Sequence, residues 1–343
     1  MSDKYNGRRA CSIENSDLHL TVLPGGGHIA SIVDKHTGVN PLWSPPWTSV
    51  DPVGTGEARL LSGIMGHNLC LDIFGGPSPE EDAAGLTPHG EGSVVAFDVV
   101  TSGHELTMKA EMPLAQIRFE RHIELQGHTI RIRESAESLA AFDRPIGWTQ
   151  HVTLGPPFLE NGKTQFRSSA SKSKVFESEF GTDAYLKAGA EFEWPLAPGK
   201  DGAYKDLRVM NLAAVSSGYT AHLMDKMNPH AFFTAWSPTT KVSFGYVWKR
   251  SDFPWLGIWE ENHSRQASPW DGKTLTRGME FGASPFPESR RESVDRGRLY
   301  DTPTYRWLPA RAKVEVEYRA ILQRTDEPLE SLAFRQGHFI LPA

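Results

Sequence analysis

Apolar and polar residues alternate in most of the extended runs of this chain, and this pattern constrains its fold more than any other feature. Near the C-terminus, Val314, Val316 and Tyr318 would share one face of a strand. Glu315 and Glu317 would share the other face, because successive side chains in a strand point to opposite sides. The alternation predicts strands over residues 18–22, 28–33, 93–101, 105–112, 116–125, 129–135, 148–154, 241–248, 256–260 and 314–322.

The strands follow one another without a long amphipathic helix between them, and only residues 327–335 predict one short helix. Short turns at Ser102-Gly103 and Gln126-Gly127 indicate an antiparallel meander. Regularly spaced strands without intervening helices favour an all-β sandwich or barrel. A length of 343 residues would suggest about two domains. No linker or repeat divides the chain, so we predict one domain over residues 1–343.

Four long irregular segments interrupt the strands, at residues 40–56, 75–92, 262–273 and 282–309. Segments of this length in a compact domain are usually functional or disordered, and their aromatic content disfavours disorder. The chain has 10 Trp, several of them in these loops. The flat C–H faces of sugars pack well on aromatic rings, which indicates carbohydrate binding. Ordinary core packing explains such residues equally well.

Charge and hydropathy exclude several classes of partner. The chain carries 36 Lys and Arg against 42 Asp and Glu, without a strongly basic block, so we expect no nucleic-acid partner. No run approaches the roughly 20 apolar residues of a membrane helix, so we expect no membrane partner. The first ten residues are polar and lack the apolar core of a secretory signal. A cytoplasmic location is therefore the expectation, and the oligomeric state stays open.

No motif indicates a metal or a cofactor. His67, His104 and His263 lack the spacing of a metal-binding motif. The glycine run at residues 24–27 has no helix after it, so we interpret it as a turn rather than a phosphate-binding loop.

Three segments carry side chains suited to proton transfer. His89 ends a long loop just before a predicted strand, and His151 would share a strand face with Thr149 and Thr153. Glu280 stands among apolar residues, where a carboxylate is rare unless it is paired or functional. The alternatives are that His89 caps a turn and that His151 is a hydrogen-bonded core histidine.

The order of these segments resembles the aldose 1-epimerase family, whose fold is called galactose-mutarotase-like. Residues 26–38 look like the family's first hairpin, and His89-Gly90 looks like its early His-Gly motif. Residues 150–154 occupy the place of its Asn-His-x-Tyr-Phe signature, and residues 277–282 resemble the late strand that carries its Glu. Gln150 replaces the Asn, and Thr153-Leu154 replaces the aromatic pair, which indicates a divergent member.

The resemblance implies a β-supersandwich of large antiparallel sheets with few short helices and an open groove on one sheet face. It implies sugar mutarotation, with His151 as general acid and Glu280 as general base on opposite sides of the sugar, and without metal or cofactor. For binding the small-molecule sugar we single out His89, Arg59, Asn68, Gln150, Trp259 and Glu260. The segment from Trp259 could instead be an edge strand with solvated carboxylates, and Asp225 and Asp271 are weak options for the family's sugar-binding Asp.

Other functions fit the same pattern. The altered signature around His151 suits a non-catalytic carbohydrate-binding protein on this fold. A sugar-phosphate epimerase would need at least two arginines in the groove, for which Arg59, Arg118 and Arg290 are candidates. A polysaccharide lyase would normally have a longer chain with a helical domain.

Overall fold

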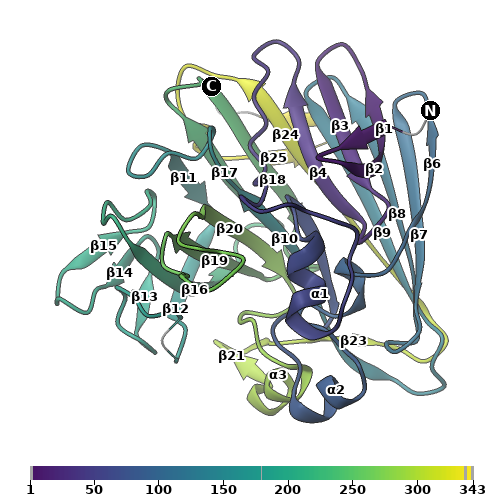
Figure 1. Cartoon of the computed structure of the whole chain (residues 1–343). Helices are drawn as coiled ribbons and strands as arrows, with labels where there is room; N and C mark the ends of the chain where they lie inside the picture. The colour runs from purple at the N-terminus through teal and green to yellow at the C-terminus, as the bar shows by residue number, and fades with distance from the viewer. Residues whose placement is uncertain (1–2, 179, 336–337, 341–343) are drawn as a thin grey trace.

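The computed structural model describes residues 3–178, 180–335 and 338–340. Two large sheets pack face to face, and the few helices are short (Figure 1). The predicted all-β supersandwich is confirmed. Within these described residues, the helices are α1 (Gly56–Gly63), α2 (Pro79–Ala83) and α3 (Arg290–Arg296), and η1 (Glu91–Ser93) is a 3-10 turn.

The larger sheet has 12 strands, and it carries the candidate site. Its path runs through β1 (Asp3–Tyr5), β2 (Arg8–Glu14), β3 (Leu18–Leu23), β4 (His28–Asp34), β5 (His67–Asp72), β10 (Arg144–Leu154), β20 (Leu275–Gly282), β19 (Trp255–Asn262), β16 (Ser216–Met224), β12 (Ala170–Val175) and β13 (Glu191–Glu193), with β23 (Arg306–Leu308) paired to β10.

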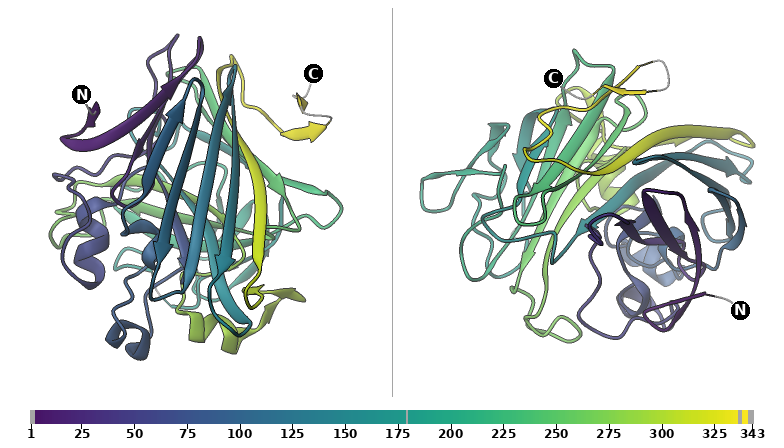
Figure 2. Two further views of the ribbon diagram at one scale, coloured as in Figure 1. Left: turned by 90° about the vertical axis from the view of Figure 1, so that its right-hand side faces the viewer. Right: turned by 90° about the horizontal axis from the view of Figure 1, so that it is seen from above.

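The smaller sheet has 8 strands and turns its outer face to the viewer in the left panel of Figure 2. Its order is β11 (Gln165–Ser168), β17 (His230–Ser237), β18 (Val242–Lys249), β24 (Lys313–Arg324), β9 (Thr129–Ser138), β8 (Ile117–Gln126), β7 (Glu105–Met112) and β6 (Asp98–Ser102). Three short hairpins complete the fold, β14 (Leu196–Pro198) with β15 (Tyr204–Asp206), β21 (Arg298–Leu299) with β22 (Thr302–Pro303), and β25 (Ala333–Arg335) with β26 (His338–Ile340).

The main core lies between the two sheets, and β10 shows how the sequence builds it. Trp148 and Val152 point into this core, where they join Phe119 and Ile132 of the smaller sheet. A second apolar cluster covers the opposite face of the larger sheet, with Trp43, Leu60, Phe74, Tyr219, Trp259, Trp270 and Phe286 among its members. Helix α1 and the long loops cover this second face (Figure 1).

Several predicted elements need correction. Residues 327–335 form no helix; the chain there is irregular until β25 begins at Ala333. Leu329 and Leu332 are spaced as on a helix, but they pack on Ile321 of the smaller sheet. The strand predicted from residue 93 begins only at Asp98.

Strands β16 and β17 were not predicted at all. Every residue of β16 is buried, so it lacks the polar-apolar alternation on which the strand prediction depends. Helices α2 and α3 also escaped prediction, although each begins with a capping box, formed by Ser78 with Glu81 and by Ser289 with Glu292.

Candidate active site

A cavity of about 200 Å³ opens on the face of the larger sheet that points away from the main core. Strands β10, β16, β19 and β20 form its base, while α1 and the loops after β5, β19 and β20 form its sides. Its ionisable lining residues are Glu57, His89, His151, Tyr219, Arg265 and Glu280, and its apolar ones include Leu60, Ile64, Phe180, Trp259 and Trp270.

His151 and Glu280 meet at the base of this cavity. They are direct cross-strand partners in the β10–β20 pairing. His151 Nε2 lies 3.0 Å from Glu280 Oε1, and both side chains are almost fully buried. On the other side of the ring, His151 Nδ1 lies 2.9 Å from Thr153 Oγ1. The two groups therefore lie side by side on one sheet face, which corrects the expectation that they stand on opposite sides of a sugar.

His89 reaches the cavity from the loop before η1, and its ring centroid lies 5.0 Å from that of His151. Its Nδ1 lies 2.6 Å from the carbonyl oxygen of Phe74. A carbonyl oxygen only accepts, so Nδ1 carries the proton. Burial, followed by the charge of His151, lowers the pKa of His89 to about 3. The ring is therefore neutral near pH 7, and its Nε2 remains a hydrogen-bond acceptor.

The backbone at His89 is held in a sparsely populated conformation, with φ of 66°. Gly90 follows with φ of 71°, and a Cβ there would lie 2.1 Å from the carbonyl oxygen of Leu71. The loop thus runs against β5 at a distance that only glycine permits. Strain of this kind is frequent where a side chain is presented to a ligand.

Two glycines make room for the Glu280 carboxylate. A Cβ at Gly278 would lie 2.3 Å from Glu280 Oε1, and a Cβ at Gly257 would lie 1.9 Å from the Tyr219 hydroxyl. The Tyr219 hydroxyl donates to the carbonyl oxygen of Pro285 at 3.2 Å. Burial, and then the negative charge of Glu280, raises the pKa of Tyr219 well above its usual value. Tyr219 therefore stays protonated beside the carboxylate.

Aromatic rings and one cation form another side of the cavity. Trp259 lies 5.8 Å from the ring of His151 and 6.1 Å from that of Trp270. The Arg265 guanidinium lies 4.7 Å from the centre of the Trp270 ring and 3.5 Å from a Glu261 carboxylate oxygen. Arg265 and Trp270 both come from the 262–273 loop. The length and the aromatic content of that loop indicated a functional segment, but no sequence motif indicated Arg265.

Gln150 was predicted to bind substrate, and the structure places it on the wrong face of the sheet for that role. Its side chain enters the main core, where Nε2 donates to Glu134 at 2.6 Å and Oε1 lies 2.9 Å from His67 Nε2. The Arg121 guanidinium, fully buried, bonds the same Glu134 carboxylate at 2.7 Å. Gln150 thus belongs to a buried polar network that lies directly behind the strand carrying His151.

Arg59 and Asn68 also lie outside the cavity. The Arg59 side chain turns to the carbonyl oxygen of Val94, at 3.4 Å. Asn68 does share a sheet face with His151, since the two are cross-strand partners. However, η1 covers it, and its amide donates to Ser93 at 3.1 Å. Neither side chain lines the cavity.

Glu260 follows Trp259 along β19, so strand geometry sends the two side chains to opposite faces. Trp259 lines the cavity. Glu260 instead accepts a hydrogen bond of 2.6 Å from Tyr185, and Arg277 lies 3.6 Å from its other oxygen. The prediction that Glu260 contacts the sugar is therefore wrong, whereas that for Trp259 stays open.

The arginines that were candidates for binding a sugar phosphate do not converge on the cavity. Arg118 pairs with Glu137 at 2.9 Å on the outer face of the smaller sheet. Arg290 binds the buried Asp72 carboxylate at 2.7 and 2.8 Å. Neither lines the cavity, nor do the two weak options for a sugar-binding Asp, Asp225 and Asp271.

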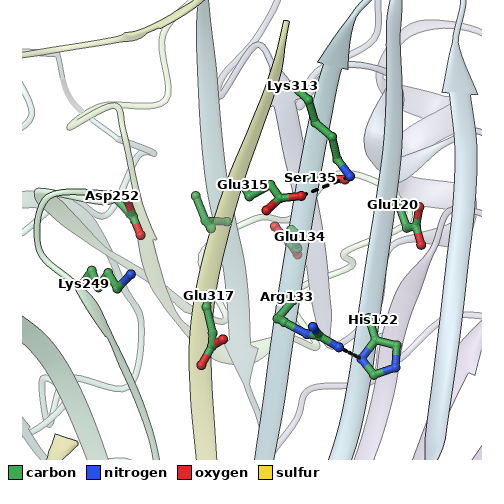
Figure 3. A pocket seen from close by; sticks show the side chains of 11 residues that line it. Glu120, His122, Arg133, Glu134, Ser135, Lys249, Asp252, Lys313, Glu315 and Glu317 are labelled. Carbon is green, nitrogen blue, oxygen red and sulfur yellow. Dashed lines mark hydrogen bonds and ion pairs between the residues drawn. The ribbon is translucent and has the colours of Figure 1, made fainter. Parts of the chain in front are cut away.

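A larger cavity, of about 460 Å³, lies on the outer face of the smaller sheet (Figure 3). Its charged side chains pair with one another, as Arg133 does with His122 at 3.1 Å and Lys313 with Glu315 at 3.1 Å. The first pair joins β8 and β9 and the second lies within β24, and polar pairs like these are typical of a solvated sheet face. The smaller cavity, with its buried His–Glu pair and aromatic lining, is the better candidate for chemistry.

Among the residues that the structure describes, no helix is long and apolar enough to cross a membrane.

Comparisons by sequence find no relative, since no family model and no curated protein matches the chain. Comparisons by structure find many. A candidate aldose 1-epimerase from Klebsiella pneumoniae has a TM-score of 0.65 at 14% identity, over 93% of this chain and 80% of that one. An aldose epimerase homologue from C. elegans has a TM-score of 0.60 at 12% identity, over 92% and 99% of the two chains.

A galactose mutarotase related enzyme from Lactobacillus acidophilus is similar too, with a TM-score of 0.59 at 13% identity, over 93% of this chain and 99% of that one. At such low identity the similarity shows the fold. The chain has the galactose-mutarotase-like fold, so the resemblance indicated by the sequence motifs is confirmed, and the low identity fits a divergent sequence.

Proposed function

We propose that the chain is a sugar mutarotase that interconverts the α and β anomers of an aldose bound in its open groove. The observation that carries this proposal is the 3.0 Å contact between His151 Nε2 and Glu280 Oε1 at the base of an aromatic cavity. The galactose-mutarotase-like fold supports the reaction class but does not select a substrate.

Mutarotation requires one base and one acid. The Glu280 carboxylate takes the proton from the anomeric hydroxyl, while the His151 imidazolium gives a proton to the ring oxygen as the C1–O5 bond breaks. The open-chain aldehyde forms, and rotation about C1–C2 exposes its other face. Ring closure then returns one proton to His151 and one to the new anomeric hydroxyl. Each side chain ends in its starting state.

The closeness of the two groups fits this chemistry. The anomeric hydroxyl and the ring oxygen are both bonded to C1, so the base and the acid must reach atoms that are close neighbours. A cross-strand pair delivers two side chains to one spot with little freedom. Thr153 fixes the tilt of the imidazole through Nδ1, at 2.9 Å.

His89 suits a binding role rather than proton transfer. Its neutral ring offers Nε2 as an acceptor for a sugar hydroxyl, and its Nδ1 proton is engaged by the carbonyl oxygen of Phe74. Trp259 offers a ring beside His151, 5.8 Å away, on which a C–H face of the sugar can pack.

The lining charges favour a neutral sugar or a uronate over a sugar phosphate. Arg265 is the single Arg or Lys among the described residues that line the cavity, and a Glu261 oxygen lies 3.5 Å from it. One half-paired guanidinium suits a carboxylate or a hydroxyl, whereas a phosphate usually recruits several cationic groups. A sugar-phosphate epimerase is therefore the less favoured alternative.

Anomer exchange measured by NMR magnetisation transfer tests the proposal, with aldoses, uronates and sugar phosphates as the panel. We expect accelerated exchange for one class, reduced at least about 100-fold in Glu280→Gln and in His151→Asn, because each removes a proton-transfer group. His122→Gln, on the outer face of the other sheet, is the matched control and should exchange at the wild-type rate.

Two results would overturn this function. Saturable sugar binding without accelerated exchange would identify a non-catalytic carbohydrate-binding protein on the same fold. Exchange that persists in both variants would show that another pair of groups performs the chemistry.

A further inference from the structure

Three turns meet at one end of the sandwich, and none of them lines the candidate active site. Asp17 lies in the turn between β2 and β3, and His36 lies in the turn that follows β4, both in the larger sheet. His128 lies in the turn between β8 and β9, in the smaller sheet. Each turn therefore contributes one of the three side chains, and the three turns come from both sheets.

The three side chains converge on one point. His36 Nε2 lies 3.1 Å and His128 Nε2 lies 3.5 Å from the same atom, Asp17 Oδ1. One potential ligand atom from each residue lies within 4.8 Å of the other two. Ligands bound tetrahedrally to zinc at about 2.0 Å are about 3.3 Å apart, so the two nitrogen–oxygen distances already match that geometry.

Two hydrogen bonds hold the turns together without using the side chains of Asp17, His36 or His128. The Lys35 amide, next to His36, donates to the carbonyl oxygen of Asp17 at 2.8 Å. The Asn15 side chain donates to the carbonyl oxygen of Gly127, next to His128, at 2.9 Å. The turn that carries Asp17 is thus bonded to both turns that carry a histidine, so the site is largely preorganised.

We propose that Asp17, His36 and His128 bind a divalent transition-metal ion, with zinc as the best match. Two imidazoles and one carboxylate are a donor set that zinc accepts, and the exposure of His36 leaves a position for water. The ion would join the two sheets at this end of the sandwich, and the metal would stabilise the fold rather than take part in anomer exchange.

The affinity should be moderate. His128 Nδ1 is buried without a hydrogen-bond partner. A metal-binding histidine is usually oriented by a hydrogen bond from its second ring nitrogen, and His128 lacks that bond. Without metal, Asp17 accepts hydrogen bonds from His36 and Ser16, and these bonds lower the pKa of its carboxyl. A plain cluster of surface ion pairs is therefore the competing explanation.

Calorimetric titration of the untagged full-length chain with zinc chloride separates the two explanations. Wild type should bind zinc saturably, and Asp17→Asn, His36→Gln and His128→Gln should each lose one equivalent or weaken it at least 10-fold. His122→Gln is the matched control, because this half-buried histidine also pairs with a carboxylate, Glu105, at 3.2 Å.

Two further readouts keep the test independent of other histidines and of the proposed function. Cobalt should give the absorption of a tetrahedral ion in wild type and in His122→Gln but not in the three ligand variants. Zinc should raise the unfolding temperature of wild type and not that of Asp17→Asn. Zinc binding that is absent from wild type, or unchanged in all three ligand variants, would overturn the proposal whatever the sugar assay shows.

Discussion

At the residue scale, the space around Glu280 matters as much as the carboxylate itself. Gly278 lies two residues before it on the same strand face, and Gly257 lies opposite it in the β19–β20 pairing. Neither has a positive φ, so conformational freedom does not explain these glycines. The two glycines are explained by the steric room that the carboxylate needs, because a Cβ at Gly278 would meet Glu280 and a Cβ at Gly257 would meet the Tyr219 hydroxyl.

Gly278→Ala should therefore disable the site more than it unfolds the protein. The added Cβ would lie 2.3 Å from Glu280 Oε1, which forces that oxygen away from His151. We expect at least a 10-fold loss of anomer exchange and a destabilisation of about 1–3 kcal/mol from overpacking. Gly218→Ala is the control, because its nearest contacts are ordinary at 3.6 and 3.9 Å. Equal activities of the two variants would contradict the steric argument.

Sequence reasoning placed some site residues better than others, for physical reasons. Motif order selected His89, His151 and Glu280, which do converge. Strand alternation already separates Gln150 from His151, and it likewise separates Glu260 from Trp259, so those two errors were avoidable. Asn68 is different, because strand alternation places it on the same sheet face as His151. Only the fold shows that η1 covers its side chain. Tyr219 and Arg265 lie in no recognisable motif, so the sequence did not indicate them.

At the element scale, a buried ion-pair cluster fixes the loops that shape the cavity. The Asp72 carboxylate is fully buried, and it accepts from Arg144 at 2.6 Å and from Arg290 at 2.7 and 2.8 Å. Arg290 also pairs with Glu81 of α2 at 3.2 Å. Helices α2 and α3 are thereby tied to the end of β5, just where the loop that carries His89 departs.

Arg290→Met should loosen this attachment. Asp72 would keep Arg144 as a partner, so we expect a loss of about 2 kcal/mol rather than the full effect of breaking a buried pair. Exchange activity should fall as well, because the loop that carries His89 becomes less well fixed. The control is Arg291→Met on the same helix, where the exposed carboxylate partners lie 3.7 and 3.9 Å from the guanidinium. We expect this variant to lose less than about 0.5 kcal/mol of stability. Chemical denaturation of both variants, alongside the exchange assay, measures the difference.

Strands with one solvated face were predicted well, whereas strands buried on both faces were predicted unevenly: β10 and β18 were found, and β16 was missed. Strands β7, β8 and β9 alternate because their outer side chains meet water. Strand β16 lies inside the larger sheet with covered faces, so its sequence shows no period of two. Helices α2 and α3 begin with capping boxes and are too short to show an apolar stripe, so hydrophobic periodicity does not indicate them.

At the scale of the whole molecule, the two stacked sheets follow from strand patterning, whereas the polar groups between them do not. The network of Arg121, Glu134 and Gln150 joins the sheets through their shared core. Arg121 and Glu134 are cross-strand partners in the β8–β9 hairpin, and the packing of the two sheets brings Gln150 of β10 to them. That residues 1–343 form one domain stays a prediction.

Buried neutral histidines should make the whole fold sensitive to mild acid. His28, His67 and His222 are fully buried, and desolvation is the largest cause that lowers each pKa, to about 3 for His28 and His222. In the unfolded chain each histidine takes up a proton near pH 6.5. Between these values the unfolded state binds more protons, so the free energy of unfolding falls as the pH falls.

The expected loss is about 1.4 kcal/mol per pH unit for each histidine, or about 4 kcal/mol per unit for the three. Total stabilities are of the order of 5–15 kcal/mol, so much of the stability should be gone near pH 5, above the range in which most carboxylates titrate. Guanidinium unfolding at pH 7.5, 6.5, 5.5 and 5.0 measures this slope, and His222→Gln should reduce it by about 1.4 kcal/mol per unit. His222 is held by Ser173 and Thr220 at 2.8 Å on either side, bonds that a glutamine amide can partly replace. A stability that stays level from pH 7.5 to 5.0 would mean that these rings take up protons in the folded core as readily as in the unfolded chain, and the neutral role of His89 would then need the same revision.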